Sequence, residues 1–162
     1  MDYFKIMDSI DKRILRLIQR DSTLSVAAIA EQVGLSQTPC WKRIQKLQRS
    51  GIIHKRVALL DADALGLPVT VFVSIRTNRH EPDWLEKFAD GVSRLPEIVE
   101  VYRMSGDIDY LLKIVAPDIA GYDRIYRRLI SIVEIYDVSS AFAMERMKVT
   151  TALPLDYVET VD

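Results

Sequence analysis

The chain has 162 residues, of which 49% are hydrophobic and 28% are charged, and it contains a single cysteine. This length suits one ordinary domain or two small ones, and the composition excludes collagen-like, disordered and disulfide-rich proteins. The longest apolar run, residues 69–75, is too short to cross a membrane, and the N-terminus lacks the features of a signal peptide. We therefore expect a soluble protein of a reducing, cytoplasmic compartment.

Charge is distributed unevenly along the chain. Residues 1–60 hold 11 Lys/Arg and 5 Asp/Glu, a net charge of +6, whereas residues 61–162 hold 11 and 18, a net charge of −7. Between residues 36 and 56 there are six basic residues and no acidic residue. The pattern favours a polyanion-binding module joined to a module with another task, although a solvated charged face is the alternative.

The first 60 residues predict three short helices. Asp8 followed by Asp11 makes a start that resembles a capping box, and apolar residues then recur at helical spacing as far as Ile18. Ser25 can cap a second helix, which Gly34 ends because glycine adopts the left-handed conformation without steric cost.

A third helix is expected from Ser36 to about Ser50, where Gly51 stops it. Two helices joined by a short turn that contains glycine form a helix-turn-helix unit. The helical period places an apolar stripe on the inner face of the third helix, formed by Cys40, Ile44 and Leu47. We expect Cys40 to be a small buried apolar residue rather than a reactive thiol.

The outer face of the third helix is predicted to contact double-stranded DNA. Lys42 suits guanine, Gln37 and Gln45 suit adenine, and Thr38 offers a methyl or a hydroxyl group. The basic residues further along are better placed for phosphates. Trp41 either contacts DNA or covers the seam between helices. The full set of expected contacts is Ser36, Gln37, Thr38, Trp41, Lys42, Arg43, Gln45, Lys46, Arg49, Lys55 and Arg56.

The remaining residues predict a strand-helix-strand-strand-helix-strand order, which is the ferredoxin-like arrangement of an α+β protein. The expected elements are a strand at 69–77, a helix at 84–95, strands at 98–104 and 110–115, a helix at 117–130 and a strand at 135–150. The predicted organisation is a helix-turn-helix domain with an extended connector at 1–60, a ferredoxin-like domain at 61–150 and a C-terminal tail at 151–162.

One face of the predicted sheet carries no helix. Alternation along the strands assigns Phe72, Tyr102 and Phe142 to that open face. An apolar face of this kind needs a cover, and a second subunit is the simplest one. We therefore expect a dimer that forms through the sheets.

With both modules in place, the sequence resembles the Lrp/AsnC family of bacterial and archaeal transcription regulators. The resemblance is carried by Asp11-Lys12-Arg13-Ile14-Leu15, by residues 33–47, by Gly51-Ile52-Ile53 and by Ser105-Gly106-Asp107-Ile108-Asp109-Tyr110-Leu111-Leu112. The sequence departs from the family pattern at Gln48, where glutamate is frequent, and at Ile132-Val133-Glu134, which replaces a Pro-Gly turn.

The resemblance implies a helix-turn-helix, winged-helix-like regulator that reads a roughly palindromic site as a dimer, with tetramers or octamers as further assemblies. It also implies an amino-acid effector at a dimer–dimer interface, with no metal or other cofactor. The expected effector residues are Ser105, Gly106, Asp107, Asp109 and Tyr110. The backbone N–H groups at Gly106 suit a carboxylate, and Asp107 or Asp109 suits an ammonium group. A plain tight turn remains the alternative for this hairpin.

Two other functional classes compete with a ligand-responsive regulator. An enzyme is disfavoured because His54 and His80 have no partner at ligand spacing and no nucleotide-binding or nucleophile motif occurs. A ligand-independent architectural protein of the nucleoid would share every DNA-binding feature and differ only at the hairpin. We expect a nucleoid-associated cytoplasmic regulator with no membrane partner.

Overall fold

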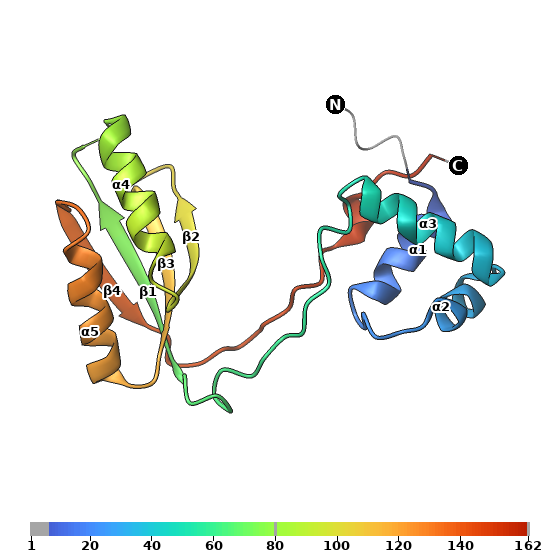
Figure 1. The fold of residues 1–162 in the computed structure, drawn as a ribbon, viewed down its shortest axis with the longest axis horizontal. Helices are drawn as coiled ribbons and strands as arrows, with labels where there is room; N and C mark the ends of the chain where they lie inside the picture. The colour runs from blue at the N-terminus through green and yellow to red at the C-terminus, as the bar shows by residue number, and fades with distance from the viewer. Residues whose placement is uncertain (1–6, 80, 162) are drawn as a thin grey trace. The chain divides into compact units, whose positions relative to one another are not determined.

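The computed structural model describes residues 7–79 and 81–161, which form two compact units. The helical unit takes its residues from 1–58 and 148–162, and the sheet unit spans 59–147. Figure 1 labels the elements, which are α1 (Ser9–Ile18), α2 (Val26–Val33), α3 (Gln37–Arg49), β1 (Val69–Arg76), α4 (Pro82–Ser93), β2 (Ile98–Arg103), β3 (Tyr110–Ala116), α5 (Ile119–Ile130), β4 (Asp137–Phe142) and the short 3₁₀ helix η2 (Leu155–Tyr157).

The three predicted N-terminal helices are present, with the predicted ends. The Asp8 carboxylate accepts from Asp11 N at 2.8 Å, and the Asp11 carboxylate accepts from Asp8 N at 3.4 Å, which completes the capping box. Ser25 caps α2, and Gly34 ends that helix with a φ of +74°. Ser36 occupies the N-cap position of α3 in extended conformation. The helices enclose a core of Met7, Ile14, Leu15, Ile18, Ile29, Ala30, Val33, Cys40, Ile44 and Leu47.

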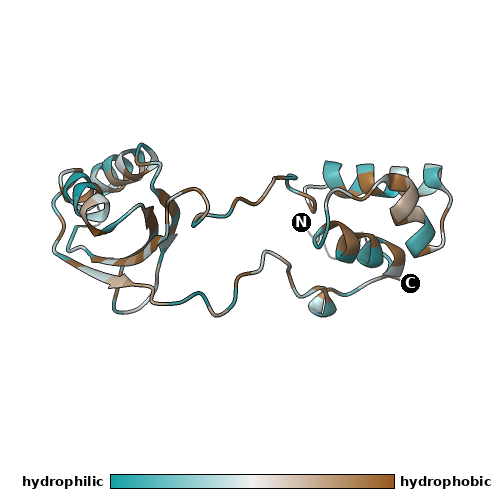
Figure 2. Cartoon of the chain, turned by 90° about the horizontal axis from the view of Figure 1, so that it is seen from below, coloured by the Kyte–Doolittle hydropathy of each residue, from teal (hydrophilic) through white to brown (hydrophobic). Residues whose placement is uncertain are grey.

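The sheet unit has the predicted ferredoxin-like order of elements. Its four strands lie in the order β2-β3-β1-β4, and every neighbouring pair is antiparallel. Helices α4 and α5 cover the same face of the sheet (Figure 1). The central strand β1 alternates as predicted, with Val71, Val73 and Ile75 fully buried toward the helices. Figure 2 shows the resulting apolar colour along the strands beneath the more hydrophilic outer faces of α4 and α5.

The prediction for the open face of the sheet is right for Phe72 and wrong for Phe142. Strand register pairs Phe142 with the buried Val71, so both side chains lie on the helical side. There the Phe142 ring meets Tyr122 of α5 edge to face, with centroids 5.1 Å apart. Tyr102 pairs with Leu111 and does lie on the open face. Sequence alternation misassigned Phe142 because the pairing of an edge strand depends on register, which a single strand does not encode.

The last strand is shorter than predicted, and the residues after it do not form a separate tail. Strand β4 ends at Phe142, whereas the prediction extended it to about residue 150. Residues from 148 onward belong to the helical unit, where Leu155 and Val158 pack against its core. The backbone N–H of Val161 also donates to the carbonyl of Met7 at 3.0 Å.

The helices described above are all short. Across the described ranges 7–79 and 81–161, every helix is too short or too polar to cross a bilayer.

Candidate DNA-binding and effector sites

The outer surface of α3 gathers most of the predicted DNA contacts. The helical period turns Cys40, Ile44 and Leu47 inward, as predicted, and all three are almost completely buried. The opposite side then faces solvent, with Gln45 partly buried and the others exposed: Gln37, Thr38, Trp41, Lys42, Gln45, Lys46 and Arg49. Ser36 is also exposed at the start of the helix. This surface combines cations with amide and hydroxyl groups, which suits the edge and backbone of a duplex.

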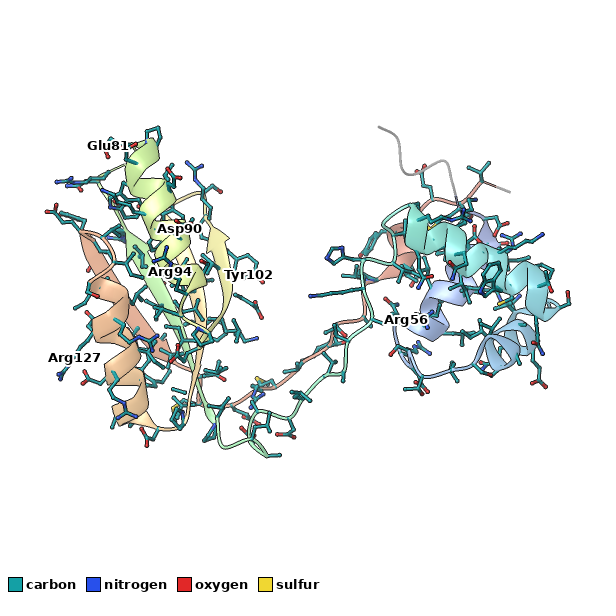
Figure 3. All side chains as sticks on the ribbon, viewed as in Figure 1. Arg56, Glu81, Asp90, Arg94, Tyr102 and Arg127 are labelled. Atoms are coloured by element: carbon teal, nitrogen blue, oxygen red, sulfur yellow. The ribbon has the colours of Figure 1, made fainter. Side chains whose placement is uncertain are left out.

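Lys55 and Arg56 lie in the irregular segment that follows α3, and both are exposed. Figure 3 labels Arg56 on this segment. Because the segment has no regular backbone hydrogen bonding, these two cations are less firmly positioned than those on the helix. Such residues suit phosphate contacts, which do not require a fixed angle to a base.

Trp41 was expected either to contact DNA or to cover a seam between helices. Its side chain is 51% exposed, so it covers part of the helical surface and offers the rest to solvent. A half-exposed tryptophan beside Lys42 places a large flat group within the same surface as the cations. The exposed part of Trp41 is compatible with the predicted DNA contact.

Arg43 has a different role from the one expected. Its Nη1 donates to Asp8 Oδ2 at 2.6 Å and to Asp11 Oδ1 at 2.8 Å, and 29% of the side chain is exposed. The guanidinium therefore links α3 to the start of α1 rather than projecting toward a phosphate. Lys46 Nζ also lies 4.0 Å from Asp11 Oδ2. Arg43 is thus engaged within the helical unit rather than presented to DNA.

Asp11 is the structural residue that the sequence interpretation missed. The sequence patterns give Asp11 a place in the capping box and in the family motif, yet its side chain is 1% exposed and holds a cation of α3. The sequence does contain a signal for this burial. Asp11 precedes Ile14, Leu15 and Ile18 at the i, i+3, i+4 and i+7 spacing of the buried stripe. A carboxylate on such a stripe requires a cation from another element. Arg43 meets this requirement.

Asp8 and Cys40 are among the groups of the helical unit whose pKa values are shifted. Burial raises the pKa of Asp8, but hydrogen bonds from Asp11 N and Arg43 outweigh it and lower the pKa below 3.8. Burial raises the pKa of the Cys40 thiol above 9.0, and the nearby Arg43 charge only partly opposes this. Cys40 is a free thiol with no exposed surface, as expected of a small apolar core residue.

The predicted effector hairpin joins β2 to β3 in the sheet unit. Gly106 has a φ of +121°, a conformation that side chains rarely adopt, so the turn depends on glycine there. Ser105, Gly106 and Asp107 are all exposed. These three residues present backbone and carboxylate groups together at the tip of the hairpin.

Asp109 and Tyr110 have structural roles within the sheet unit. Asp109 Oδ2 accepts from the backbone N–H of Thr77 at 2.7 Å, which ties the hairpin to the end of β1. The Tyr110 side chain is 7% exposed and packs against Trp84 and Phe88, with ring centroids 6.0 and 4.7 Å away. The structure therefore places Tyr110 in the core and leaves it no exposed ring for an effector.

A shallow groove of about 410 Å³ lies beside the start of α4 and was not predicted. Within it Trp84 Nε1 donates to the carbonyl of Glu134 at 3.0 Å, and Arg79 pairs with the Glu134 carboxylate at 2.8 Å. Figure 3 labels Glu81 near the start of α4. The lining residues are Arg79, Glu81, Asp83, Trp84, Lys87, Ile132, Val133 and Glu134. The groove includes Ile132-Val133-Glu134, where the sequence departs from the family pattern.

The described residues contain no group of three or more His, Cys, Asp or Glu side chains that could hold a metal ion. Of the two histidines considered at the outset, His54 is exposed after α3, and His80 lies outside the described residues.

Helices α2 and α3 form a helix-turn-helix, and the exposed face of α3 is polar and basic. This combination defines a class of DNA-binding proteins, to which the sheet unit adds a second module. Residues 7–54 match the winged helix-turn-helix DNA-binding family. Residues 70–153 match the Lrp/AsnC ligand binding domain. The chain belongs to the Lrp/AsnC family, as its sequence motifs predicted, and is a DNA-binding transcription regulator with a ligand-binding domain.

This chain is similar to relatives and to solved structures over nearly its whole length. The glutamate uptake regulatory protein of Zymomonas mobilis is 48% identical over 149 residues, which cover 92% of this chain and 91% of that protein. The crystal structure of an AsnC family transcriptional regulator from Agrobacterium tumefaciens is 60% identical, with a TM-score of 0.91, covering 94% of this chain and 100% of that one. The Neisseria meningitidis regulator NMB0573, solved with L-Met, is 30% identical with a TM-score of 0.90, covering 94% and 99%.

Proposed function

We propose that this regulator reads its operator with the outer face of α3 and adjusts its DNA binding to a small amino acid. The observation that carries the first part is the orientation of α3. Its three apolar residues are buried, while Lys42 and the neighbouring polar side chains face solvent. In this proposal Gln37, Thr38, Lys42 and Gln45 contact bases. Ser36, Trp41, Lys46, Arg49, Lys55 and Arg56 contact the backbone.

The proposed effector site lies at the hairpin tip. Ser105, Gly106 and Asp107 are exposed there, and the exposed backbone of the glycine turn suits a carboxylate while Asp107 suits an ammonium group. The match to a ligand binding domain supports this part, as does the L-Met held by the Neisseria regulator. Asp109 contributes by fixing the hairpin against β1 rather than by direct contact.

We infer that the protein acts as a dimer formed through the open face of the sheet. Phe72 is 39% exposed and Tyr102 is 50% exposed on that face. The two helical units of the dimer, which we call its heads, then read two half-sites on DNA. An effector that binds two assembly states with different affinities favours one of them and so changes DNA binding. The protein has no enzymatic role in this proposal, and it acts on chromosomal DNA in the cytoplasm.

Sequencing the genomic fragments that the protein retains, with and without a mixture of amino acids, tests both parts. A discrete set of fragments sharing one motif supports sequence-specific regulation. A set of fragments that changes with amino acids supports sensing. Even coverage of the genome contradicts specific regulation and favours the architectural alternative.

Isothermal titration with each of the twenty amino acids then tests the effector site directly. Heat from at least one amino acid in the native chain, lost in the Asp107→Ala variant, supports the hairpin site. Heat that Asp107→Ala leaves unchanged contradicts that location. No heat from any amino acid favours a ligand-independent protein.

A further inference from the structure

The outer side of α1 is covered by the C-terminal end of the chain. Lys12 and Arg16 of α1 and its C-cap residue Gln19 follow one another at i, i+4 and i+7. Each of them bonds to the C-terminal strap, which we define as residues 153–161. The Gln19 amide donates to the carbonyl of Leu153 at 3.1 Å and accepts from its N–H at 3.0 Å. This reciprocal pair fixes the direction in which the strap approaches.

The rest of the strap combines polar and apolar contacts. Lys12 Nζ donates to the carbonyl of Val158 at 3.0 Å, and Arg16 forms an ion pair with Asp156. Between these contacts Leu155 and Val158 pack against the core of the helical unit. Figure 1 shows the end of the chain beside the helices of this unit. The strap is thus an ordered part of the DNA-binding unit, although it follows the sheet unit in sequence.

The docked strap gives the helical unit a second covalent link to the sheet unit. The first connector, residues 54–68, leads from the segment after α3 to β1, and the second connector, residues 143–152, leads from the end of β4 to the strap. Each connector crosses one of the two boundaries between the units, at residues 58/59 and 147/148. Ten residues span at most about 35 Å, so docking limits how far the head can move from the end of β4. A unit held at two points also has less rotational freedom than a unit held at one.

We propose that the docked strap sets the spacing of half-sites that this regulator accepts on DNA. Two heads of a dimer must reach half-sites about one helical turn, or a multiple of it, apart. One flexible connector per head tolerates several spacings, because a connector that is not fully extended can bridge a range of distances. A second connector removes part of that tolerance. This inference rests on the proposed dimer that reads paired half-sites.

The proposal is tested by lengthening the second connector. Ten Gly/Ser residues inserted after Met147 double its length without touching the strap or its partners on α1. The DNA probes carry two half-sites from a retained genomic fragment, with centres about 10, 15 and 20 base pairs apart. We expect the native chain to prefer one spacing. The insertion should reduce that preference on the order of threefold, because doubling a flexible linker lowers the effective concentration of the tethered unit by about that factor. The same ten residues added after Asp162 are the control.

A second pair of variants separates docking from connector length. Leu155→Ser with Val158→Ser removes the apolar contacts of the strap, whereas Tyr157→Ser changes a side chain that is 86% exposed in the same segment. The double variant is expected to lose spacing preference as the insertion does, and Tyr157→Ser is expected to keep it. Hydrogen exchange of α1 to α3 in each protein shows whether the head itself stays folded.

The outcomes separate this proposal from the proposed function. If the native chain binds these probes with a spacing preference that the insertion leaves unchanged, the strap does not set spacing. Equal affinity of the native chain for all spacings overturns the strap proposal as well, while DNA binding itself stands. Failure of the native chain to bind any probe contradicts the proposed function and this inference together.

Discussion

Arg43 of α3 donates a 2.8 Å hydrogen bond to the carboxylate of Asp11, a side chain of α1 that is 1% exposed. The same guanidinium reaches Asp8, the N-cap residue of α1. Helix α3 is therefore held against α1 by one of its own cations. A buried carboxylate of this kind is stable only while its partner remains, because the unpaired charge would have to be desolvated alone.

Arg43→Met should destabilise the helical unit by about 3 kcal/mol, because it removes the cation that donates to the buried Asp11 carboxylate and leaves Lys46 Nζ 4.0 Å away. Replacing both residues, Asp11→Leu with Arg43→Met, should recover much of this loss because no buried charge remains. A urea titration read from the backbone NMR signals of the helical unit measures both changes. Equal stability of Arg43→Met and the native chain would show that the ion pair contributes nothing.

Gly91 of α4 packs against Ile132, one of the residues that line the groove. A Cβ atom at this position would lie 2.2 Å from Ile132 Cγ2, far inside contact distance. Alanine ordinarily stabilises a helix interior by up to about 1 kcal/mol relative to glycine. Here the clash with Ile132 should outweigh the gain in helix propensity, and Gly91→Ala should destabilise the sheet unit by about 1–3 kcal/mol.

The matched test shortens the side chain that causes the clash. Gly91→Ala combined with Ile132→Ala should be more stable than Gly91→Ala alone, measured by thermal unfolding. A Gly91→Ala variant that melts above the native chain would mean that the loop after α5 moves aside at no cost.

Phe72 lies on the open face of the sheet, through which we expect the dimer to form. Phe72 lies next to Lys113, which pairs with Glu100 at 2.7 Å, while Tyr102 donates to the same carboxylate at 2.6 Å. Placing a second charge here with Phe72→Lys should raise the dimer dissociation constant at least roughly tenfold, because a buried cation would lack a partner.

Analytical ultracentrifugation measures this constant. Ala89→Lys, which adds the same charge at an exposed position of α4, is the control and should leave the constant unchanged. A dimer that persists in Phe72→Lys at the native affinity would show that another surface joins the subunits.

Sequence patterns predicted the elements that depend on local chemistry. Helix caps at Asp8 and Ser25, the left-handed Gly34 and the alternation of β1 all follow from neighbouring residues, and the structure confirms each of them. The inner stripe of α3 was predicted for the same reason, since its three apolar residues recur with the helical period.

Features that depend on distant residues were not predicted. Arg43 looked like a phosphate contact because its partner Asp11 is 32 residues away in sequence. The side of the sheet on which Phe142 lies depends on its register with β1, and the core position of Tyr110 depends on Trp84 and Phe88 of α4. The strap was not predicted because its partners, on α1 and at the C-cap of that helix, are ordinary exposed polar residues.

Lys42 and Arg49 provide the sharpest test of how α3 meets DNA. Both are exposed cations on the outer face, but Lys42 lies in the first half of the helix, which enters the major groove in helix-turn-helix proteins. Arg49 lies in the last turn, and its Nε donates to the carbonyl of Gln45 at 3.3 Å. We assign base reading to Lys42 and phosphate contact to Arg49.

Lys42→Ala should therefore reduce the preference for one base at a single operator position by about 1–3 kcal/mol. Arg49→Ala should weaken binding to all sequences about equally and should reduce the dependence of log affinity on log salt by about one unit. Fluorescence anisotropy on a set of single-base operator variants, at several salt concentrations, measures both effects. If Arg49→Ala changes base preference while Lys42→Ala changes only the salt dependence, α3 lies along the duplex in the opposite orientation.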